Sequence, residues 1–353
     1  MTPAATPLHI LAGGLQPTPP EVGQGLRVAL YQGEGPAGSR EAVEANMERL
    51  DEAVALASDH GAQVCVFPEC YPTGYALGSS LIRELAQHQD GPILARAARS
   101  AREHATAVVL PYIERDGEKI YDSITVIAPG GTPLTNYRKT HLYGAAEQSN
   151  FSPGTKLPPL IELNGIGVGL LNCYECEFPP LYQYLAERGA RVVIGPTAAE
   201  HHYRMPNGRL SAIPYPDATV HIIPAMASIW RLFIAYANRR GWEHPDPGPS
   251  RFYRANSGIW APDGNALVTA TPAEQNHDCL IIADCLPGTA TPFSPEGDHL
   301  RDNRLSLNSG LRIADDRETP YDAETCEGNF VPPGNPGTAP AVPPQPNTLR
   351  RRS

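Results

Sequence analysis

Three residues that could take part in chemistry follow segments typical of buried strands. Glu69 and the proline before it follow the apolar run 63–67, Lys139 follows a strand-like segment and its turn, and Cys173 ends another apolar run. Ligands of open α/β sheets bind where strands end, so the three side chains could converge. A thiolate can attack, a carboxylate can take the thiol proton and an ammonium can stabilise an oxyanion. Singly, each residue has a more ordinary interpretation, as a capping or solvated acid, a surface lysine or a core cysteine.

The stretch "GLLNCYECEFPP" around Cys173 admits three interpretations. The cysteine could be a buried structural residue, half of a Cys-x-x-C redox or metal site with Cys176, or a nucleophile at a strand-to-helix turn. A thioredoxin-like Cys-x-x-C should open a helix after the first strand, and the sequence has no second Cys-x-x-C to complete a zinc site. These observations weaken the redox and metal interpretation.

Composition narrows the classes of partner. The chain has 353 residues, a formal net charge of −10 and 41% hydrophobic residues, which is enough for a sizeable core. The negative charge argues against nucleic acid as the main partner, since phosphate binding needs a basic face. No apolar stretch is long enough to span a bilayer, so we expect no membrane partner. Seven cysteines, an odd number, do not make a disulfide framework and favour a reducing, cytoplasmic compartment.

Strand-like and helix-like patterns alternate along the chain, which predicts an α/β fold with a mixed sheet. Expected strands cover residues 26–32, 63–67, 107–115, 120–129, 166–173, 191–198, 232–238, 257–262 and 279–284, and expected helices cover 41–60, 81–104 and 179–190. We expect residues 1–25 to be a flexible leader and residues 26–318 to form one domain. Residues 319–353 are rich in proline and glycine and are predicted to be an extended or disordered tail.

In order and spacing, the segments that carry these residues resemble the nitrilase superfamily of carbon–nitrogen hydrolases. The motifs are "FPE" at 67–69, "YRKTHL" at 137–142 and "CYECEFP" at 173–179. A fourth acid, Glu147, precedes an "FSPG" turn, where the family has an acid ahead of an F-x-P-G turn. The resemblance covers roughly residues 26–311.

The resemblance implies a fold and a role for each motif residue. The implied fold is an α-β-β-α sandwich with two mixed β-sheets. Cys173 would be the nucleophile, Glu69 the general base and acid, and Lys139 an oxyanion donor together with the backbone N–H of Tyr174. Glu147 would hold Lys139 or the substrate nitrogen in place. The family chemistry implies no cofactor and no metal.

Within the superfamily, "FPECYPTGYALG", "YRKTHLYG" and "CYECEFPP" are most similar to the bacterial aliphatic amidase branch. That branch implies hydrolysis of a small primary amide to a carboxylate and ammonia by a homodimer or higher homo-oligomer. Alternatives that use the same residues are a nitrilase, which forms a thioimidate, an N-carbamoyl amidohydrolase and an acyl transferase. An inactive member acting as a scaffold is a further alternative, against which the intact catalytic positions argue. Candidates for the substrate pocket are Cys70, Tyr75, Glu175, Pro196, Thr197 and Ala198.

Several departures from the family pattern bear on the substrate. Glu175 replaces the usual aspartate, Pro180 stands where the family usually has an acid, and the stretch 226–230 is apolar where the family has an arginine and a glutamate. The stretch 199–223 looks longer than a plain amidase needs, so we expect it to shape a pocket for a larger or more specialised substrate. Its adjacent histidines would point opposite ways in a strand, which argues against a metal site there.

Overall fold

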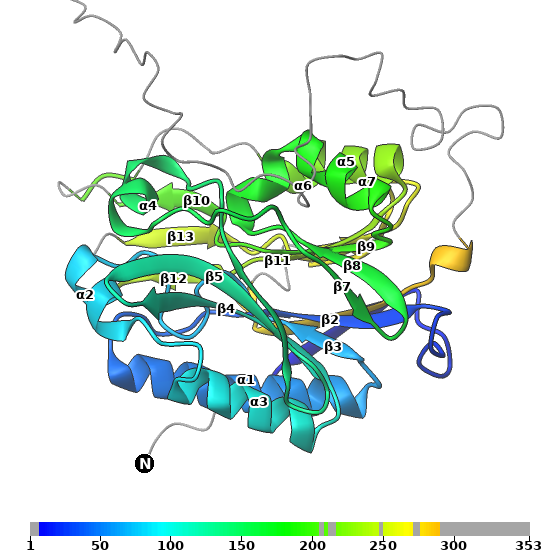
Figure 1. The fold of residues 1–353 in the computed structure, drawn as a ribbon, viewed down its shortest axis with the longest axis horizontal. Helices are drawn as coiled ribbons and strands as arrows, with labels where there is room; N and C mark the ends of the chain where they lie inside the picture. Colours follow the sequence, from blue (N-terminus) through cyan, green and yellow to red (C-terminus); the bar gives the residue numbers. More distant parts are fainter. Residues whose placement is uncertain (1–6, 205–207, 211–216, 247–249, 271–275, 290–353) are drawn as a thin grey trace, which may run out of the picture. The chain divides into compact units, whose positions relative to one another are not determined.

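The computed structural model describes residues 7–204, 208–210, 217–246, 250–270 and 276–289. Contacts divide the chain into residues 1–311 and 312–353, and the second unit, with the predicted tail, lies outside the described residues. In the first unit two β-sheets lie face to face with helices on their outer faces (Figure 1). The predicted α-β-β-α sandwich is thereby confirmed.

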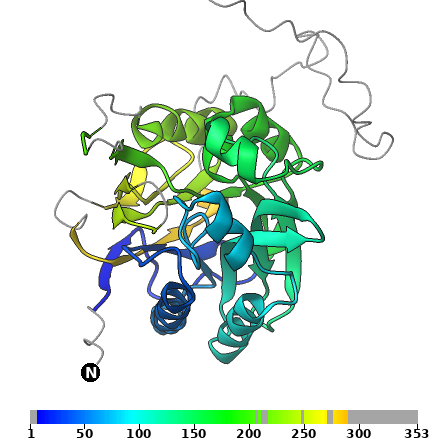
Figure 2. The ribbon, with the colours of Figure 1, turned by 90° about the vertical axis from the view of Figure 1, so that its left-hand side faces the viewer.

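The first sheet has seven strands in the order β1-β16-β2-β3-β4-β5-β6. Their bounds are His9–Gly13 (β1), Leu26–Gln32 (β2), Val64–Val66 (β3), Ala107–Asp116 (β4), Lys119–Ile127 (β5), Pro133–Arg138 (β6) and Cys279–Cys285 (β16). The sheet is mixed, because β2, β3 and β4 pair in parallel while β4, β5 and β6 pair antiparallel. Helices α1 (Arg40–Asp59) and α3 (Pro92–Glu103) lie side by side against its outer face (Figure 2).

The second sheet has six strands in the order β15-β14-β11-β9-β8-β7, and three further strands form a small sheet, β10-β13-β12. The bounds are Leu160–Leu163 (β7), Ile166–Leu170 (β8), Val192–Pro196 (β9), Glu200–Tyr203 (β10), Phe233–Ala237 (β11), Arg240–Glu243 (β12), Arg251–Arg254 (β13), Gly258–Trp260 (β14) and Ala266–Thr269 (β15). Helices α5 (Pro179–Glu187) and α7 (Ile223–Trp230) pack on each other above this sheet (Figure 1). The remaining helices are α2 (Ser79–Leu85), α4 (Gly144–Asn150), α6 (Ala218–His221) and the 3-10 helices η1 (Cys173–Glu177) and η3 (Pro287–Thr289).

Strand β2 illustrates why the sheets stack. Leu26, Val28 and Leu30 point into the core between the sheets, while Ala29 and Tyr31 belong to the core under the helices α1 and α3. The strand is therefore buried on both faces, which explains its nearly continuous apolar sequence. Each such buried aliphatic side chain contributes about 2 kcal/mol through removal of apolar surface from water.

One predicted helix and part of the predicted leader were wrong. The pattern at 81–104 forms two helices: α2 ends at Leu85, and α3 begins at Pro92, which lacks an N–H and disfavours helical backbone at the residue before it. Residues 9–13, expected in the flexible leader, form β1, which pairs in parallel with β16 from His9↔Cys279 to Gly13↔Ala283. The partner strand lies far along the chain, so no local pattern signalled the pairing.

Two stretches that depart from the family pattern, 226–230 and 199–223, can be located in the fold. The apolar stretch 226–230 is the end of α7, where Met226 and Ala227 pack in one core cluster with Tyr182 and Leu185 of α5. The stretch 199–223 contains β10 and α6, and its residues 205–207 and 211–216 lie outside the described part.

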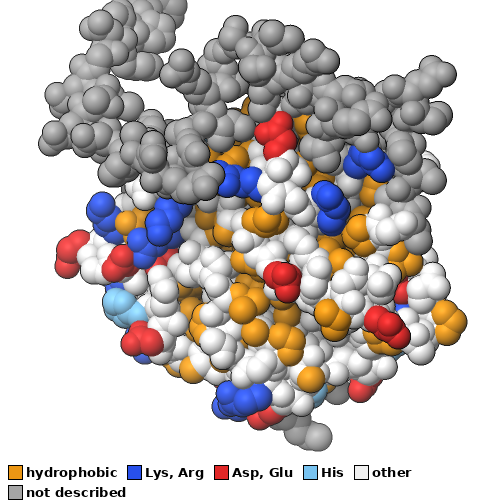
Figure 3. Space-filling view, turned by 45° about the vertical axis from the view of Figure 1, so that its right-hand side comes forward, with side chains coloured by type: hydrophobic (Ala, Val, Ile, Leu, Met, Phe, Trp, Pro, Cys, Tyr) orange, Lys and Arg blue, Asp and Glu red, His pale blue; other side chains and the backbone are white. Residues whose placement is uncertain are grey.

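The surface in Figure 3 carries acidic and basic side chains interspersed among apolar ones. Within the described ranges, every helix is too short or too polar to traverse a bilayer.

Candidate active site

Cys173 is the first residue of the short helix η1, at a sharp turn that follows β8. Its φ of 51° is in the left-handed region, which is unfavourable for a residue with a side chain and is often found at functional turns. The buried Leu170 and Leu171 fix the end of the strand before it. Glu175 holds the turn, because its Oε2 accepts the N–H of Asn172 at 3.0 Å.

The thiol of Cys173 contacts the end of the neighbouring strand. Thr197, which follows β9, donates its hydroxyl to Cys173 Sγ at 3.2 Å. The hydroxyl of Tyr236 in β11 donates in turn to Thr197 Oγ1 at 3.4 Å. Since β9 pairs in parallel with both β8 and β11, the ends of three adjacent strands meet at the sulfur.

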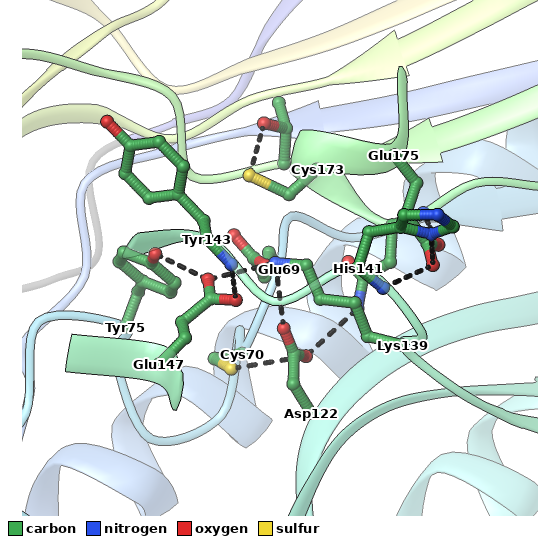
Figure 4. Close-up of polar contacts among 12 residues, drawn as sticks. Glu69, Cys70, Tyr75, Asp122, Lys139, His141, Tyr143, Glu147, Cys173 and Glu175 are labelled. Atoms are coloured by element: carbon green, nitrogen blue, oxygen red, sulfur yellow. Dashed lines mark hydrogen bonds and ion pairs between the residues drawn. The ribbon is translucent and has the colours of Figure 1, made fainter. Parts of the chain in front are cut away.

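Two carboxylates from the first sheet and one from helix α4 surround one ammonium (Figure 4). Lys139 Nζ lies 2.7 Å from Glu69 Oε1, 2.9 Å from Glu147 Oε1 and 3.3 Å from Asp122 Oδ2. All four side chains are buried. Glu69 follows β3, Asp122 lies in β5, Lys139 follows β6 and Glu147 lies in α4, so four elements build the cluster.

Glu147 is fixed by two further donors. The Tyr75 hydroxyl donates to its Oε1 at 2.6 Å, and the Tyr143 N–H donates to its Oε2 at 2.7 Å. Glu69 differs, because its Oε1 accepts from Lys139 while its buried Oε2 has no hydrogen-bond partner among the described residues. A buried carboxylate oxygen without a donor is well placed to take up a proton.

Burial and charge shift the proton affinities of this cluster. Burial raises the pKa of Glu69, and the charges of Asp122 and Glu147 add to the rise although Lys139 opposes it. Burial alone would lower the pKa of Lys139, but Glu69, Glu147 and Asp122 raise it well above its usual value. Burial, followed by the charge of Glu69, raises the pKa of the Cys173 thiol, again against Lys139. The lysine therefore stays charged, and the thiol needs a base to become a thiolate.

Cys173 opens onto a pocket of about 380 Å³, a volume that includes the pocket mouth. Of the predicted pocket residues, Tyr75, Thr197 and Ala198 line it, as do Cys173 and Tyr174. The wall also contains Tyr143, Glu177, Ala199, Glu200 and Tyr236, of which the sequence pattern indicated only the segment at 199–200 as a pocket border.

A family model for carbon–nitrogen hydrolases matches residues 27–293. The chain belongs to the carbon–nitrogen hydrolase family. It is 37% identical over 247 residues to a hydrolase encoded in the pqqF 5' region of Pseudomonas protegens, with 69% of this chain and 79% of that protein covered. It is 31% identical over 263 residues to an (R)-stereoselective amidase of a Pseudomonas species, with 74% of this chain and 87% of that amidase covered.

Solved structures of a Nesterenkonia amidase of the nitrilase superfamily share the fold of this hydrolase. One superposes with a TM-score of 0.66 at 27% identity and covers 81% of this chain and 96% of the amidase. A mutant of that amidase in complex with acrylamide gives a TM-score of 0.67 at 26% identity, over 84% of this chain and 98% of the amidase. In a further structure acrylamide has added to the active-site cysteine of that amidase. The predicted superfamily is confirmed, and the chain is a hydrolase of carbon–nitrogen bonds.

Three predicted pocket residues of this hydrolase do not line the pocket at Cys173. Cys70 is completely buried, and its Sγ donates to Asp122 Oδ1 at 3.7 Å. Pro196 is the buried last residue of β9. The third, Glu175, is directed toward the segment that follows β6.

Glu175 connects the turn of Cys173 to the segment that carries Lys139. Its Oε1 accepts the Tyr137 hydroxyl at 2.7 Å, the Thr140 hydroxyl at 2.7 Å and the Thr140 N–H at 2.8 Å. Burial acts to raise the pKa of Glu175, but these and other hydrogen bonds outweigh burial and lower it. The carboxylate thus stays ionised and positions two candidate catalytic residues from different sheets.

Sequence reasoning missed Asp122. Its Oδ1 accepts a hydrogen bond from Nδ2 of Asn172 at 3.0 Å, so Asp122 links the lysine cluster to the residue before Cys173. Asp122 lies inside the apolar strand β5 and belongs to no motif. The sequence pattern that could have indicated its burial is the alternation of side chains between the two faces of a strand. Asp122 shares a face with Ile120 and Ile124, which are both buried.

The cluster has the composition of a cation site, because Glu69, Asp122 and Glu147 offer oxygens within 4.8 Å of one another. The Lys139 ammonium contacts an oxygen of each of these acids, so it takes the position between them. The chain's own cation thereby balances part of their charge. The absence of a metal or cofactor from the chemistry stays a prediction.

Proposed function

We propose that this protein hydrolyses small primary amides to a carboxylic acid and ammonia through a thioester on Cys173. The observation that carries the proposal is the carboxylate of Glu69. Its buried Oε2 accepts no hydrogen bond within the described part of the chain, and it lies beside the ammonium of Lys139 and next to a pocket whose wall contains the Cys173 thiol (Figure 4). A nucleophile, a proton acceptor and a fixed cation are the three groups that cleavage of an unactivated amide needs.

The first half of the reaction forms the thioester. Glu69 takes the proton of the Cys173 thiol, and the sulfur attacks the amide carbon. The developing oxyanion is stabilised by Lys139 and by the N–H of Tyr174, which lies in the first turn of η1, where backbone N–H groups have no partner within the helix. One such donor typically contributes about 3 kcal/mol to transition-state stabilisation.

The second half releases both products. The tetrahedral intermediate collapses, the C–N bond breaks, and Glu69 returns its proton to the nitrogen, which leaves as ammonia. Glu69 then takes a proton from water, and the hydroxide adds to the thioester carbon. The C–S bond breaks to give the acid, and Glu69 returns its proton to the Cys173 sulfur, which restores the starting enzyme. Glu147, held by Tyr75 and Tyr143, keeps Lys139 in position through both halves.

A substrate panel tests the proposal. We expect purified protein to release ammonia and acid from aliphatic primary amides faster than from nitriles or N-carbamoyl amines. Intact mass measured after rapid quenching should show an acyl adduct, which also separates an enzyme from a scaffold. Cys173→Ala should abolish adduct and turnover, and Glu69→Gln should reduce turnover at least about 100-fold. Undiminished turnover in either variant would remove that residue from the mechanism.

We further infer a homodimer or higher homo-oligomer that works in the cytoplasm. The family resemblance supports the assembly. None of the six cysteines of the described part is in a disulfide bond, which supports a reducing compartment. Light scattering of the purified protein measures the assembly, and a monomer at micromolar concentration would contradict it.

A further inference from the structure

The pocket wall at Cys173 combines aromatic rings with acids. The rings belong to Tyr75, Tyr143, Tyr174 and Tyr236, and the acids are Glu177 and Glu200. Among the described residues no lysine or arginine lines this pocket.

The surroundings of the pocket add further negative charge. The cluster below Cys173 contains three carboxylates and one ammonium. Arg251 Nη1 lies 2.9 Å from Glu200 Oε2, and Arg251 lines an adjoining cavity that shares Tyr75, Tyr143 and Glu200 with the pocket. Arg251 thus offsets part of the charge of Glu200.

We propose that this hydrolase selects primary amides that carry an ammonium group on the acyl side over neutral amides and, more strongly, over anionic ones. The inference rests on the proposed amidase function. An ammonium is attracted both by carboxylates and by the faces of tyrosine rings. In a primary amide the leaving group is ammonia, so the acyl side is the only place for the charge.

The same charge helps the reaction step. Attack by Cys173 creates an oxyanion in a pocket with an excess of carboxylates, which disfavours added negative charge. A cationic substrate offsets that excess, whereas an anionic substrate increases it. Selection therefore acts on the transition state as well as on binding.

Three amides of matched length test the inference: β-alaninamide, butyramide and succinamate. At neutral pH the first is a cation, the second is uncharged and the third is an anion. We expect kcat/KM for β-alaninamide to exceed that for succinamate by at least about tenfold, with butyramide between them. The difference should shrink as sodium chloride is added, because salt screens charge.

Substitutions of the two pocket acids test whether these acids cause the preference for cationic amides. Glu200→Gln and Glu177→Gln should each lower the ratio of kcat/KM for β-alaninamide over butyramide by about threefold or more. Glu103→Gln, the same change on the exposed face of α3, is the matched control and should leave the ratio unchanged. Thermal melting shows whether each variant is folded, and either pocket variant alone suffices for the test.

The outcomes separate this inference from the proposed function. Faster hydrolysis of succinamate than of β-alaninamide overturns the charge selection and leaves the amidase function standing. An unchanged ratio in either folded variant, Glu200→Gln or Glu177→Gln, also overturns it. If none of the three amides is hydrolysed and no acyl adduct forms on Cys173, the amidase function fails and the selection fails with it.

Discussion

Glu69 and Cys173 both have pKa values raised by burial, so each holds its proton more tightly than in water. A proton that leaves the thiol thus passes to a base whose affinity for protons is also raised, and Lys139 stabilises whichever partner is negative. The transfer needs no net loss of a proton to solvent. At the scale of single residues, the site couples a buried acid, a buried thiol and a permanent cation.

This coupling predicts the pH dependence of the reaction. Glu69 must be ionised to accept a proton, and its raised pKa means that it is protonated at a higher pH than an ordinary glutamate. Activity should therefore fall, as pH is lowered, at a pH clearly above the usual glutamate value of about 4.3. The measurement is kcat/KM for butyramide against pH, with circular dichroism to show that the protein stays folded. An acid limb at or below the ordinary value would contradict the prediction.

Thr197 should make the Cys173 thiol easier to ionise. The hydroxyl donates to the sulfur, and such a bond favours the thiolate. Thr197→Val removes the donor at similar volume, so the pH profile for alkylation of Cys173 by iodoacetamide should shift to higher pH. Thr197→Ser keeps the hydroxyl and should keep the wild-type profile. Superimposable profiles for the valine variant would show that the bond does not tune the thiol.

Sequence alone predicted the residues that motifs carry and missed those that pairing brings in. Glu69, Lys139 and Glu147 lie in recognisable strings and meet in one cluster, as expected from strand ends that converge. Asp122 reaches the same lysine from the interior of a strand, and its place depends on β5 lying between β4 and β6. Glu175 lies in a motif, yet its direction depends on the backbone of the turn, which residue types do not specify.

At the scale of elements, η1 and the segment after β6 act as one unit, because Glu175 in η1 binds three groups of Tyr137 and Thr140. Glu175→Ala would leave these buried donors without an acceptor. We expect the free energy of unfolding to fall by about 3 kcal/mol. Because Cys173 and Lys139 would lose their common support, kcat should also fall.

Urea denaturation and kcat measure the two effects of Glu175→Ala. Glu162→Ala, at an exposed position of β7, is the matched control and should change both by little. If Glu175→Ala lowered stability but left kcat at the wild-type value, the connection would be structural only.

Element boundaries also show what local patterns miss. The apolar periodicity at 81–104 continues across the break between α2, which ends at Leu85, and α3, which begins at Pro92. Apolar spacing indicates which face is buried and not whether the helical backbone is continuous. The sequence at 9–13 gave no such signal, since its order comes from pairing with β16.

At the scale of the whole described fold, the site depends on the stacking of two sheets. Cys173 and Thr197 end strands of the second sheet, while Glu69 and Lys139 follow strands of the first. The apolar core between the sheets, with side chains such as Val28 and Val168, sets their separation. Catalytic geometry is therefore a property of the sandwich and should be lost cooperatively on unfolding.

The edge of the first sheet offers a test at this scale. Deleting residues 1–13 removes β1 and leaves β16 with an unpaired edge, although all seven residues of β16 are buried in the intact sheet. We expect the free energy of unfolding to fall by about 2 kcal/mol and self-association to rise, because an open edge of an apolar strand pairs with other chains. Urea denaturation and light scattering measure the two effects. Deleting residues 1–6, which keeps β1 complete, is the matched control, and equal stability of the two truncated proteins would show that β1 adds nothing to the sheet.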